Sequence, residues 1–310
     1  MIFLYVENYE LLAIDEAQRI PAVGLGLKII VDQRENIYIV VTGSSSFDLS
    51  QQVGEPLTGR KRTIILYPLS QKELYFQYNK YELKEKLEEF LIFGSYPEIM
   101  ISKNKEEKIE ILNELVNSYL LKDILSLEKV KSPKVLLDLL KLLAFQVGKE
   151  VSLNELSNSL KIDVKTVGRY LDLLEKSFVI KRINGFSRNL RREVTKKAKY
   201  YFIDNGVRNG VISQFNDLSL RNDQEELWEN FMVSERMKKL AYSKIYRNLY
   251  FWRTYDGQEV DLVEEGEGKL FGYEFKWSDR KKSKKPKDWD SYENSEFRVI
   301  NRENYLDFVL

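Results

Sequence analysis

Leu11 to Pro21 of this 310-residue chain read LLAIDEAQRIP, and this stretch decides what fold we expect at the N-terminal end. Its apolar run LLAI ends in Asp15 and Glu16. A second apolar run, Ile37 to Val41, ends in Thr42-Gly43-Ser44, and a helical stretch separates the two runs. Continuous apolar runs joined by a helix are typical of parallel strands that are covered on both faces. Polar residues at the carboxyl ends of such strands are where α/β folds place ligands.

The composition narrows the chemistry that this chain can perform. Hydrophobic residues make up 43% and charged residues 31% of the sequence, which is typical of a folded globular protein and not of a disordered one. The sequence contains no cysteine and no histidine, which excludes disulfides, Cys/His zinc sites and histidine-based triads. Catalysis therefore has to use carboxylates, lysine, arginine, hydroxyls or a metal ion held by oxygen.

The apolar runs indicate a cytoplasmic protein without a membrane partner. None of them reaches the roughly 20 residues that a membrane-spanning helix needs. The first residues carry Glu7 and Glu10 and lack the basic start of a signal peptide. The net charge is +1, so nucleic-acid binding would have to come from local basic patches and not from the overall charge.

The middle of the chain has the periodicity of helices. Residues 70–147 are largely helical by pattern. Lys84 to Phe93 is amphipathic, Lys108 to Leu127 repeats leucine and isoleucine at helical spacing, and Gly94 to Pro97 interrupt the pattern between them. Residues 133–203 predict three helices and then two strands, at about 135–147, 152–160, 164–177, 178–183 and 198–203. Asn184-Gly185 predicts a turn after the first of these strands. Three helices followed by a two-stranded wing form the pattern of a winged helix-turn-helix.

The third of these helices is expected to present basic residues to solvent. Its apolar positions Val167, Leu171, Leu174 and Phe178 fall at helical spacing and should face the core. Lys165, Thr166, Arg169 and Tyr170 should then be exposed near its N-terminal end, where this motif contacts nucleic acid.

The surrounding segment is strongly basic. Between Lys161 and Lys199 there are 12 Lys and Arg against 4 Asp and Glu. Such a local excess predicts contact with phosphates, mainly along the backbone, at Lys165, Arg169, Arg188, Arg191 and Arg192. The alternative is a protein-interaction or packing module with a solvated basic face.

Residues 204–310 place carboxylates and a lysine where they can meet. The pattern predicts a helix at 225–240 and strands at 249–255, 258–264, 270–276 and 297–300. Glu274 and Lys276 alternate along one strand, so they share a face, and a hairpin brings Asp261 beside them. Two carboxylates can hold Mg²⁺, and the lysine can orient the attacking water or stabilise the developing phosphate charge. The alternative is a same-face ion pair of little energetic value.

In this order, the motifs resemble a bacterial and archaeal family of AAA-type ATPases with a C-terminal domain of unknown function. LLAIDEAQRIP resembles a Walker B segment, VVTGSSS the strand with a sensor hydroxyl, and LTGRKRTIILYPLS the segment with an arginine finger. The resemblance implies that Asp15 holds Mg²⁺, that Glu16 orients the attacking water, and that Thr42 or Ser44 lies near the γ-phosphate. It implies Arg60, with Arg62 second, as the finger that reaches a neighbouring copy or a related ATPase chain.

The chain departs from this family at the phosphate-binding loop. The family places GxxxxGK[ST] before its Asp-Glu pair, and no such motif occurs in this sequence. That loop supplies backbone amides and a lysine to the phosphates. The resemblance further implies an N-terminally truncated sheet that lacks two strands, one of which normally lies between the two strands seen here. ATP and Mg²⁺ are the implied cofactors, but the missing loop argues against ATP binding and against isolated hydrolysis by this chain.

The C-terminal segment resembles the PD-(D/E)xK nuclease core, which has a restriction-endonuclease-like fold. The resemblance implies catalytic roles for Asp261, Glu274 and Lys276, and a metal site formed by Glu229, Asp261 and Glu274. The expected fold class is α/β and α+β multidomain. It comprises a partial AAA-type parallel sheet at 1–75, a helical lid-like region at 76–132, a winged-helix module at 133–203 and the nuclease-like domain at 204–310.

Three functions stay open on the sequence alone. The first is a fragment of an AAA-type ATP-binding protein that is associated with DNA. The second is a non-catalytic nucleic-acid-binding or regulatory module. The third is a Mg²⁺-dependent nuclease that acts through the C-terminal domain, to which the basic loop at 280–287 would add backbone contacts.

Overall fold

The computed structural model describes residues 9–34, 36–43, 57, 59–120, 132–187, 197–255, 257–278 and 284–310. The side chains of residue 18 and of residues 118–120 lie outside this description. Within the described residues, no helix is both long enough and apolar enough to cross a membrane.

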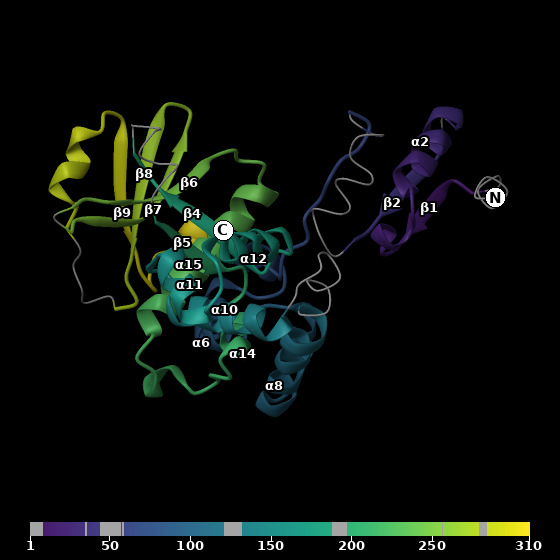
Figure 1. The fold of residues 1–310 in the computed structure, drawn as a ribbon. Helices are drawn as coiled ribbons and strands as arrows, with labels where there is room; N and C mark the ends of the chain where they lie inside the picture. The colour runs from purple at the N-terminus through teal and green to yellow at the C-terminus, as the bar shows by residue number, and fades with distance from the viewer. Residues whose placement is uncertain are drawn as a thin grey trace.

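The N-terminal segment forms a small β-α-β unit, which lies to one side of the main body in Figure 1. Strand β1 (Leu11–Ile14) pairs in parallel with strand β2 (Tyr38–Val41), and helix α2 (Val23–Gln33) connects them. The helix buries Val23, Leu27 and Ile30, which fall at helical spacing. The order of the elements and their parallel pairing are those expected from the sequence.

Two expectations for this unit are wrong. The first placed a missing strand between β1 and β2, but the two strands pair directly with each other. The second had both strand faces covered, but the side chains of Leu11, Tyr38 and Val40 are 57%, 76% and 53% exposed. Only the face that packs on α2 is covered, because the described chain supplies no second layer.

Short helices follow, as the periodicity predicted. They are α4 (Gln71–Leu74), α5 (Lys80–Glu85), α6 (Leu87–Phe93), α7 (Pro97–Ile101), α8 (Lys105–Glu114) and the π-helical turn η2 (Leu115–Leu120). Ser70 with Glu73 and Asn79 with Glu82 form capping boxes that start α4 and α5. Gly94 ends α6 with φ +73°, a conformation that favours glycine, and Pro97 starts α7. The predicted interruption at Gly94 to Pro97 is confirmed.

The segment expected to be a winged helix has helices α10 (Pro133–Phe145), α11 (Leu153–Leu160) and α12 (Val164–Lys176) and strands β3 (Glu150–Val151), β4 (Ile180–Gly185) and β5 (Ala198–Phe202). Side chains of Ser152 and Asp163 cap α11 and α12 at their N-terminal ends. The predicted turn at Asn184-Gly185 is wrong. Both residues continue β4, because Asn184 pairs with Tyr250 and Gly185 with Phe251 of the neighbouring strand.

The C-terminal part contains α14 (Asn205–Val211), η3 (Leu218–Leu220), α15 (Gln224–Tyr242), β6 (Asn248–Arg253), β7 (Glu259–Gly266), β8 (Lys269–Phe275), η4 (Lys287–Ser291), β9 (Ser295–Ile300) and α16 (Tyr305–Val309). The bounds of α15 and of the four strands agree with the predicted ones to within two residues. Helix α15 is buried along most of its length, including Trp228 and Phe231.

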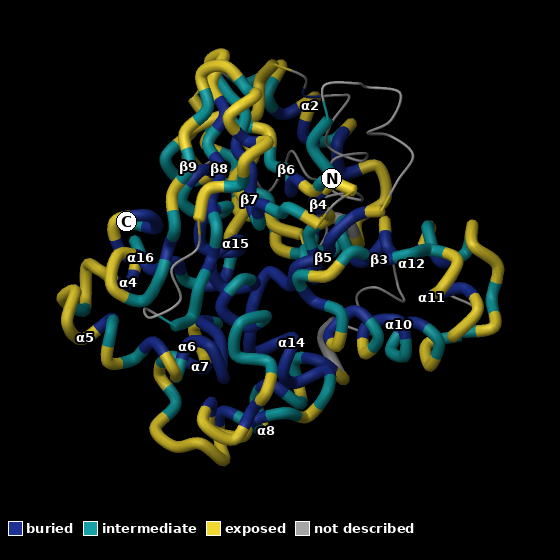
Figure 2. The backbone as a smooth tube through the Cα atoms, turned by 90° about the vertical axis from the view of Figure 1, so that its left-hand side faces the viewer, coloured by how far each residue is buried: buried dark blue, intermediate teal, exposed yellow. Residues whose placement is uncertain are grey.

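One sheet and one core join the middle and C-terminal parts of the chain. Within the described residues this sheet has seven strands in the order β3-β5-β4-β6-β7-β8-β9, and β4 pairs in parallel with β6. Its main core extends from Leu74 to Val309 and includes helices α6, α10, α12, α14 and α15. Figure 2 shows the buried backbone where α6 and α14 meet. The segments 76–132, 133–203 and 204–310 all contribute to this main core, and the C-terminal part has a second, smaller cluster around Trp252 and Trp289.

Candidate functional site

Strands β7 and β8 bring the predicted Asp261 and Glu274 to the same place. The antiparallel register pairs Val263 with Gly272 and Leu262 with Tyr273, so Asp261 lies opposite Glu274 at the next position. The backbone N–H of Phe275 donates to Asp261 Oδ2 at 2.7 Å. Because the side chain of Phe275 points to the opposite face and is buried there, the alternation expected from the sequence is confirmed.

Lys276 completes this group beside the end of β8. Its Nζ lies 2.6 Å from Glu274 Oε1. Partial burial works to lower the pKa of the Lys276 ammonium, but the carboxylates of Glu274, Asp261 and Glu225 raise it overall. Asp261, Glu274 and Lys276 thus meet as predicted, and the ion pair keeps the lysine charged.

Glu229 of α15 reaches the group from the helix that packs on the sheet. Glu229 Oε1 accepts hydrogen bonds from the Tyr201 hydroxyl at 2.6 Å and from Lys199 Nζ at 3.2 Å. Burial, followed by the charge of Glu229, raises the pKa of Tyr201 well above its ordinary value. The predicted Glu229 is therefore close to the other carboxylates, but its Oε1 atom already accepts hydrogen bonds from two side chains of β5.

Lys199 is the residue of this site that the sequence analysis missed. Its side chain is 2% exposed, and its Nζ lies 2.7 Å from Glu259 Oε1 as well as 3.2 Å from Glu229 Oε1. Burial alone would lower the pKa of Lys199, but Glu229, Asp261 and Glu259 raise it above its ordinary value. A signal was available, since Lys199 is the only charged residue in the otherwise apolar strand AKYYF. Lys199 is counted among the basic residues from Lys161 to Lys199 and was therefore not assigned to this site.

The carboxyl group of Asp261 is surrounded by other charged groups of this site. Burial and the neighbouring charges of Glu229 and Glu274 raise its pKa well above the ordinary value. Lys199 and the N–H of Phe275 counteract only part of this shift. Perturbed carboxyl groups of this kind are frequent at functional sites, although structural ion pairs also produce them.

The expected metal site of Glu229, Asp261 and Glu274 stays a prediction. Among the residues that the structure describes, no three acidic side chains are placed so that they could hold one metal ion. The physical reason is that each expected ligand already has a partner from the chain. Glu229 accepts from Tyr201 and Lys199, Asp261 accepts from Phe275 N–H, and Glu274 is paired with Lys276.

At the N-terminal unit, the structure brings Asp15, Glu16 and Thr42 together at the carboxyl ends of β1 and β2. The Thr42 hydroxyl donates to Asp15 Oδ1, and the Glu16 backbone N–H donates to Thr42 Oγ1 at 3.2 Å. Glu16 has φ +50°, a left-handed conformation that costs energy in a residue other than glycine. Ser44, the alternative sensor residue, lies outside the described residues.

Arg60 does not lie with these three residues. It forms an ion pair with Asp32, near the C-terminal end of α2. Helix α2 starts close to where β1 ends and finishes just before β2 starts. Asp32 is therefore at the opposite end of the strands from Asp15 and Thr42, so within one chain Arg60 points away from them.

The predicted nucleic-acid residues are only partly described. Lys165 and Arg169 are exposed on α12, whereas Arg188, Arg191 and Arg192 lie outside the described residues. The expected exposure of Tyr170 is wrong, because its ring is buried in the core and Arg169 lies 5.6 Å from the ring centroid. Phe178 was expected in the core but is only half-buried, and its ring packs edge-on against Tyr67.

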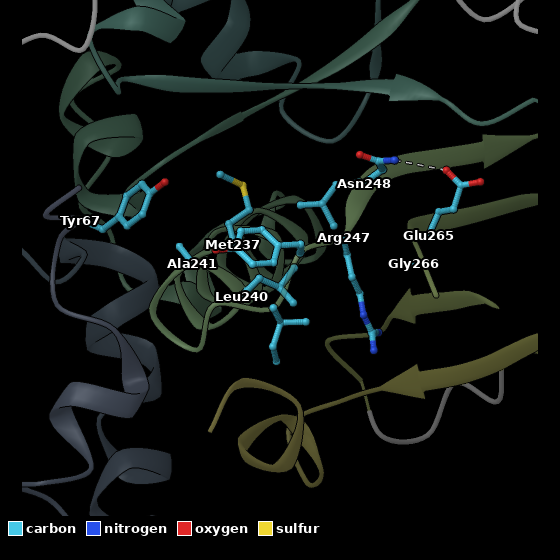
Figure 3. Close-up of a pocket in the computed structure, with 11 residues that line it drawn as sticks. Tyr67, Met237, Leu240, Ala241, Arg247, Asn248, Glu265 and Gly266 are labelled. Carbon is cyan, nitrogen blue, oxygen red and sulfur yellow. Dashed lines mark hydrogen bonds between the residues drawn. The ribbon is translucent and has the colours of Figure 1, made fainter. Parts of the chain in front are cut away.

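Two surface cavities lie elsewhere. One of about 560 Å³ is lined by Tyr67, by the end of α15 and by the start of β6, and Figure 3 shows Asn248 of β6 donating to Glu265, its partner on β7. The other, about 530 Å³, includes Lys239, whose pKa is lowered to about 8 by burial and by Arg236 and Lys72. None of the predicted site residues lines either cavity.

Comparisons with known proteins divide the chain into three parts. Residues 2–75 match a family described as an AAA domain. Residues 84–218 and 224–304 match two families described as domains of unknown function, DUF8612 and DUF4143. No solved structure matches the chain.

The chain is also similar to uncharacterized proteins from distant organisms. One from Mycobacterium tuberculosis is 26% identical over 269 residues, which cover 86% of this chain and 58% of the relative. One from Haemophilus influenzae is 31% identical over 239 residues, which cover 74% and 56%. One from Methanocaldococcus jannaschii is 27% identical over 284 residues, which cover 86% and 61%.

These alignments cover between 56% and 61% of the length of the relatives. The AAA domain and the C-terminal domain of unknown function, matched in this order along one chain, support an AAA-type ATPase-like family with a C-terminal domain.

Proposed function

We propose that this protein functions in a nucleotide-dependent process. Asp15, Glu16 and Thr42 would form the part of an ATP site that holds the metal ion and the attacking water. The observation that carries the proposal is the contact between Thr42 Oγ1 and Asp15 at the carboxyl ends of two paired parallel strands. This is the edge at which α/β sheets bind ligands. The match of residues 2–75 to an AAA domain supports the same interpretation.

The backbone at Glu16 adds support. A left-handed conformation in a residue other than glycine costs about 1–2 kcal/mol, so it persists where the surroundings hold it. Here it lets the Glu16 N–H reach Thr42 Oγ1, while the Glu16 carboxylate lies 3.3 Å from Arg19. The aspartate, the glutamate and the hydroxyl are thereby held in one small region.

The residues fit one half of an ATP site. Asp15 would hold Mg²⁺ through water, and Glu16 would orient the attacking water. When bound, Mg²⁺ neutralises negative charge on the phosphate oxygens. Residues 1–310 contain no GxxxxGK[ST] motif, so these residues by themselves do not supply the other half, the cradle for the phosphates. We therefore expect weak ATP binding and no isolated hydrolysis.

Titration with Mn²⁺–ATP, followed by the electron paramagnetic resonance of Mn²⁺, tests this proposal. We expect a dissociation constant on the order of 1 mM for the unaltered chain. Asp15→Asn and Thr42→Val should each weaken it about tenfold, since each removes part of a charge-assisted hydrogen bond. Glu10→Gln is the matched control, because Glu10 is an exposed carboxylate at the other end of β1. An unaltered chain that binds no Mn²⁺–ATP, or an Asp15→Asn chain that binds as tightly, would contradict the proposal.

A second candidate function is contact with a nucleic-acid backbone through α12. The observation that favours it is the exposure of Lys165 and Arg169 in the first two turns of this helix. Lysine and arginine side chains contact the phosphates of a nucleic-acid backbone, and these two cations would supply such contacts. DNA as a partner is thus a proposal that rests on Lys165 and Arg169, the two described residues of the five predicted for nucleic-acid contact.

A further inference from the structure

Lys199 is a buried cation beside a group of partly buried carboxylates, since the side chains of Glu229 and Glu259 are 16% and 33% exposed. Its Nζ contacts Glu259 Oε1 at 2.7 Å and Glu229 Oε1 at 3.2 Å, and the ring centroid of Phe251 is 5.5 Å away. Carboxylates taken out of water require a paired cation, because an unpaired buried charge is very costly. The described structure meets this requirement with a side chain of the protein.

The strand that carries Lys199 is firmly anchored. Lys199 pairs with Glu150 of β3 and with Ile183 of β4, so it sits between two neighbouring strands of the sheet. Tyr201, two residues along, shares its face and donates to the same Glu229 oxygen. Both β5 side chains therefore reach the carboxylates as part of the sheet, and their position does not depend on a mobile loop.

The second carboxylate oxygen of Glu229, Oε2, also has a close neighbour in the chain. A Cβ placed on Gly148, which has φ +75°, would lie only 2.9 Å from Glu229 Oε2. The carboxylate is thus bounded by the Gly148 backbone on one oxygen and by Lys199 and Tyr201 on the other. Mg²⁺ takes about six oxygen ligands in near-octahedral geometry, often including several waters, and Lys199 and Tyr201 already hold the Glu229 oxygen that would be one of these ligands.

We propose that the Lys199 ammonium takes the place of a divalent cation among Glu229, Glu259 and Asp261. The group is then a metal-independent junction that ties β5 to α15 and β7. This inference concerns the C-terminal body alone and does not depend on the proposed nucleotide site. It also gives a reason why no group of acidic side chains suited to a metal ion occurs among the described residues, although their order along the chain is nuclease-like.

Metal-dependent thermal unfolding of Lys199→Met tests the junction. The long apolar side chain of methionine keeps most of the packing and removes the charge, which leaves the carboxylates unpaired. Without metal, we expect the unfolding midpoint to fall by roughly 10 °C. Millimolar Mn²⁺ or Mg²⁺ should restore much of this loss in Lys199→Met, while the unaltered protein should show no response.

Lys197→Met is the matched control. Lys197 lies just before the same strand, but it is exposed and pairs with Glu150 at the surface. Its replacement should change the midpoint little and create no response to metal. A Lys199→Met protein that is destabilised but unaffected by metal would contradict the proposal, because its freed carboxylates would then not attract a cation.

Metal binding by the unaltered protein tests the inference independently of how well Lys199→Met folds. Mn²⁺ binding measured by calorimetry should be absent from the C-terminal site, so Asp261→Asn should leave the titration unchanged. Mg²⁺- or Mn²⁺-dependent nicking of plasmid DNA should likewise be absent. Metal binding that disappears in Asp261→Asn, or nicking that disappears in both Asp261→Ala and Lys276→Ala, would overturn the inference and support the predicted nuclease.

Discussion

Single carboxylates in this protein make the burial of arginine side chains possible. Asp223 is an example, since its carboxylate accepts from Arg221 Nε at 2.8 Å and from Arg208 Nη1 at 2.6 Å. Burial works to raise the pKa of Asp223, but Arg221 and Arg208 lower it to about 2. Both arginines are almost fully buried, so Asp223 is the charge that makes their burial tolerable.

Asp223→Asn should therefore cost stability in a pH-dependent way. The pKa in the folded protein lies below the ordinary value of 3.8, so the charge contributes stability above about pH 4 and loses it as the pH falls toward 2. We expect the ionisation of this partly exposed group to be worth about 1 kcal/mol at pH 7. Urea unfolding at several pH values measures it. A difference between variant and unaltered protein that stays constant from pH 7 to pH 2 would show that the charge is not the cause.

At the scale of elements, α14 packs against α6 at a distance that only glycine permits. A Cβ on Gly206 would lie 2.0 Å from the carbonyl oxygen of Phe93. Asn205 and Asn209, on the same helix, donate to the free carbonyl groups of Leu91 and Ile92 at the end of α6. This close approach lets side-chain amides satisfy the carbonyl groups at the end of α6.

Gly206→Ala should destabilise the protein, whereas Gly168→Ala should not. The added methyl group at Gly206 has to displace backbone, which should cost about 3 kcal/mol or slightly more. Gly168 lies in α12 and would have no atom within 4 Å of a new Cβ, so alanine should stabilise it by about 0.5–1 kcal/mol. Chemical denaturation of the two variants compares them directly. Equal effects at both positions would mean that helix propensity, and not the close approach, decides the outcome.

Helix α12 offers the second test at this scale. Lys165→Glu combined with Arg169→Glu should weaken DNA binding, because two cations that contact phosphates are replaced by anions. The slope of log K against log salt should fall in magnitude by about 1–2 units. The control is Lys134→Glu with Lys141→Glu, an equal charge change at exposed positions of α10. Equal loss of binding in both double variants would indicate a general charge effect and not a surface on α12.

At the scale of the whole molecule, the described residues form two bodies of very different size. The β-α-β unit has a small core around Ala17, Val23, Leu27 and Leu57. The other described residues contain the large core that extends from Leu74 to Val309 and a smaller cluster around Trp252 and Trp289. Because a small core buries little apolar surface, the N-terminal unit should be the less stable of the two.

Calorimetry should accordingly resolve two unfolding transitions. Leu27→Ala should shift only the transition at lower temperature, and Leu140→Ala only the one at higher temperature. Each leucine is almost completely buried in its own core, and such replacements typically cost about 2–5 kcal/mol. A single transition, or a shift of both transitions by either replacement, would show that the two bodies unfold together.

Several features could be predicted from the sequence because they depend on local periodicity. The alternation along β8 places Glu274 and Lys276 on one face whatever the rest of the chain does. The bounds of α12 follow from its apolar spacing and from the Asp163 cap. The contact of Asp15 with Thr42 follows from two apolar runs with polar ends, since parallel strands align their carboxyl ends.

Other features depended on the packing of distant segments. Asn184-Gly185 has the sequence of a turn, but hydrogen bonds to β6 draw it into the sheet, and the side-chain pattern contains no signal for such pairing. Lys199 belongs to a basic stretch, but three carboxylates from α15 and β7 make it a buried counter-charge. Local sequence sets which way a side chain points along its own element, whereas the cost of burying its charge depends on groups that only tertiary packing brings near.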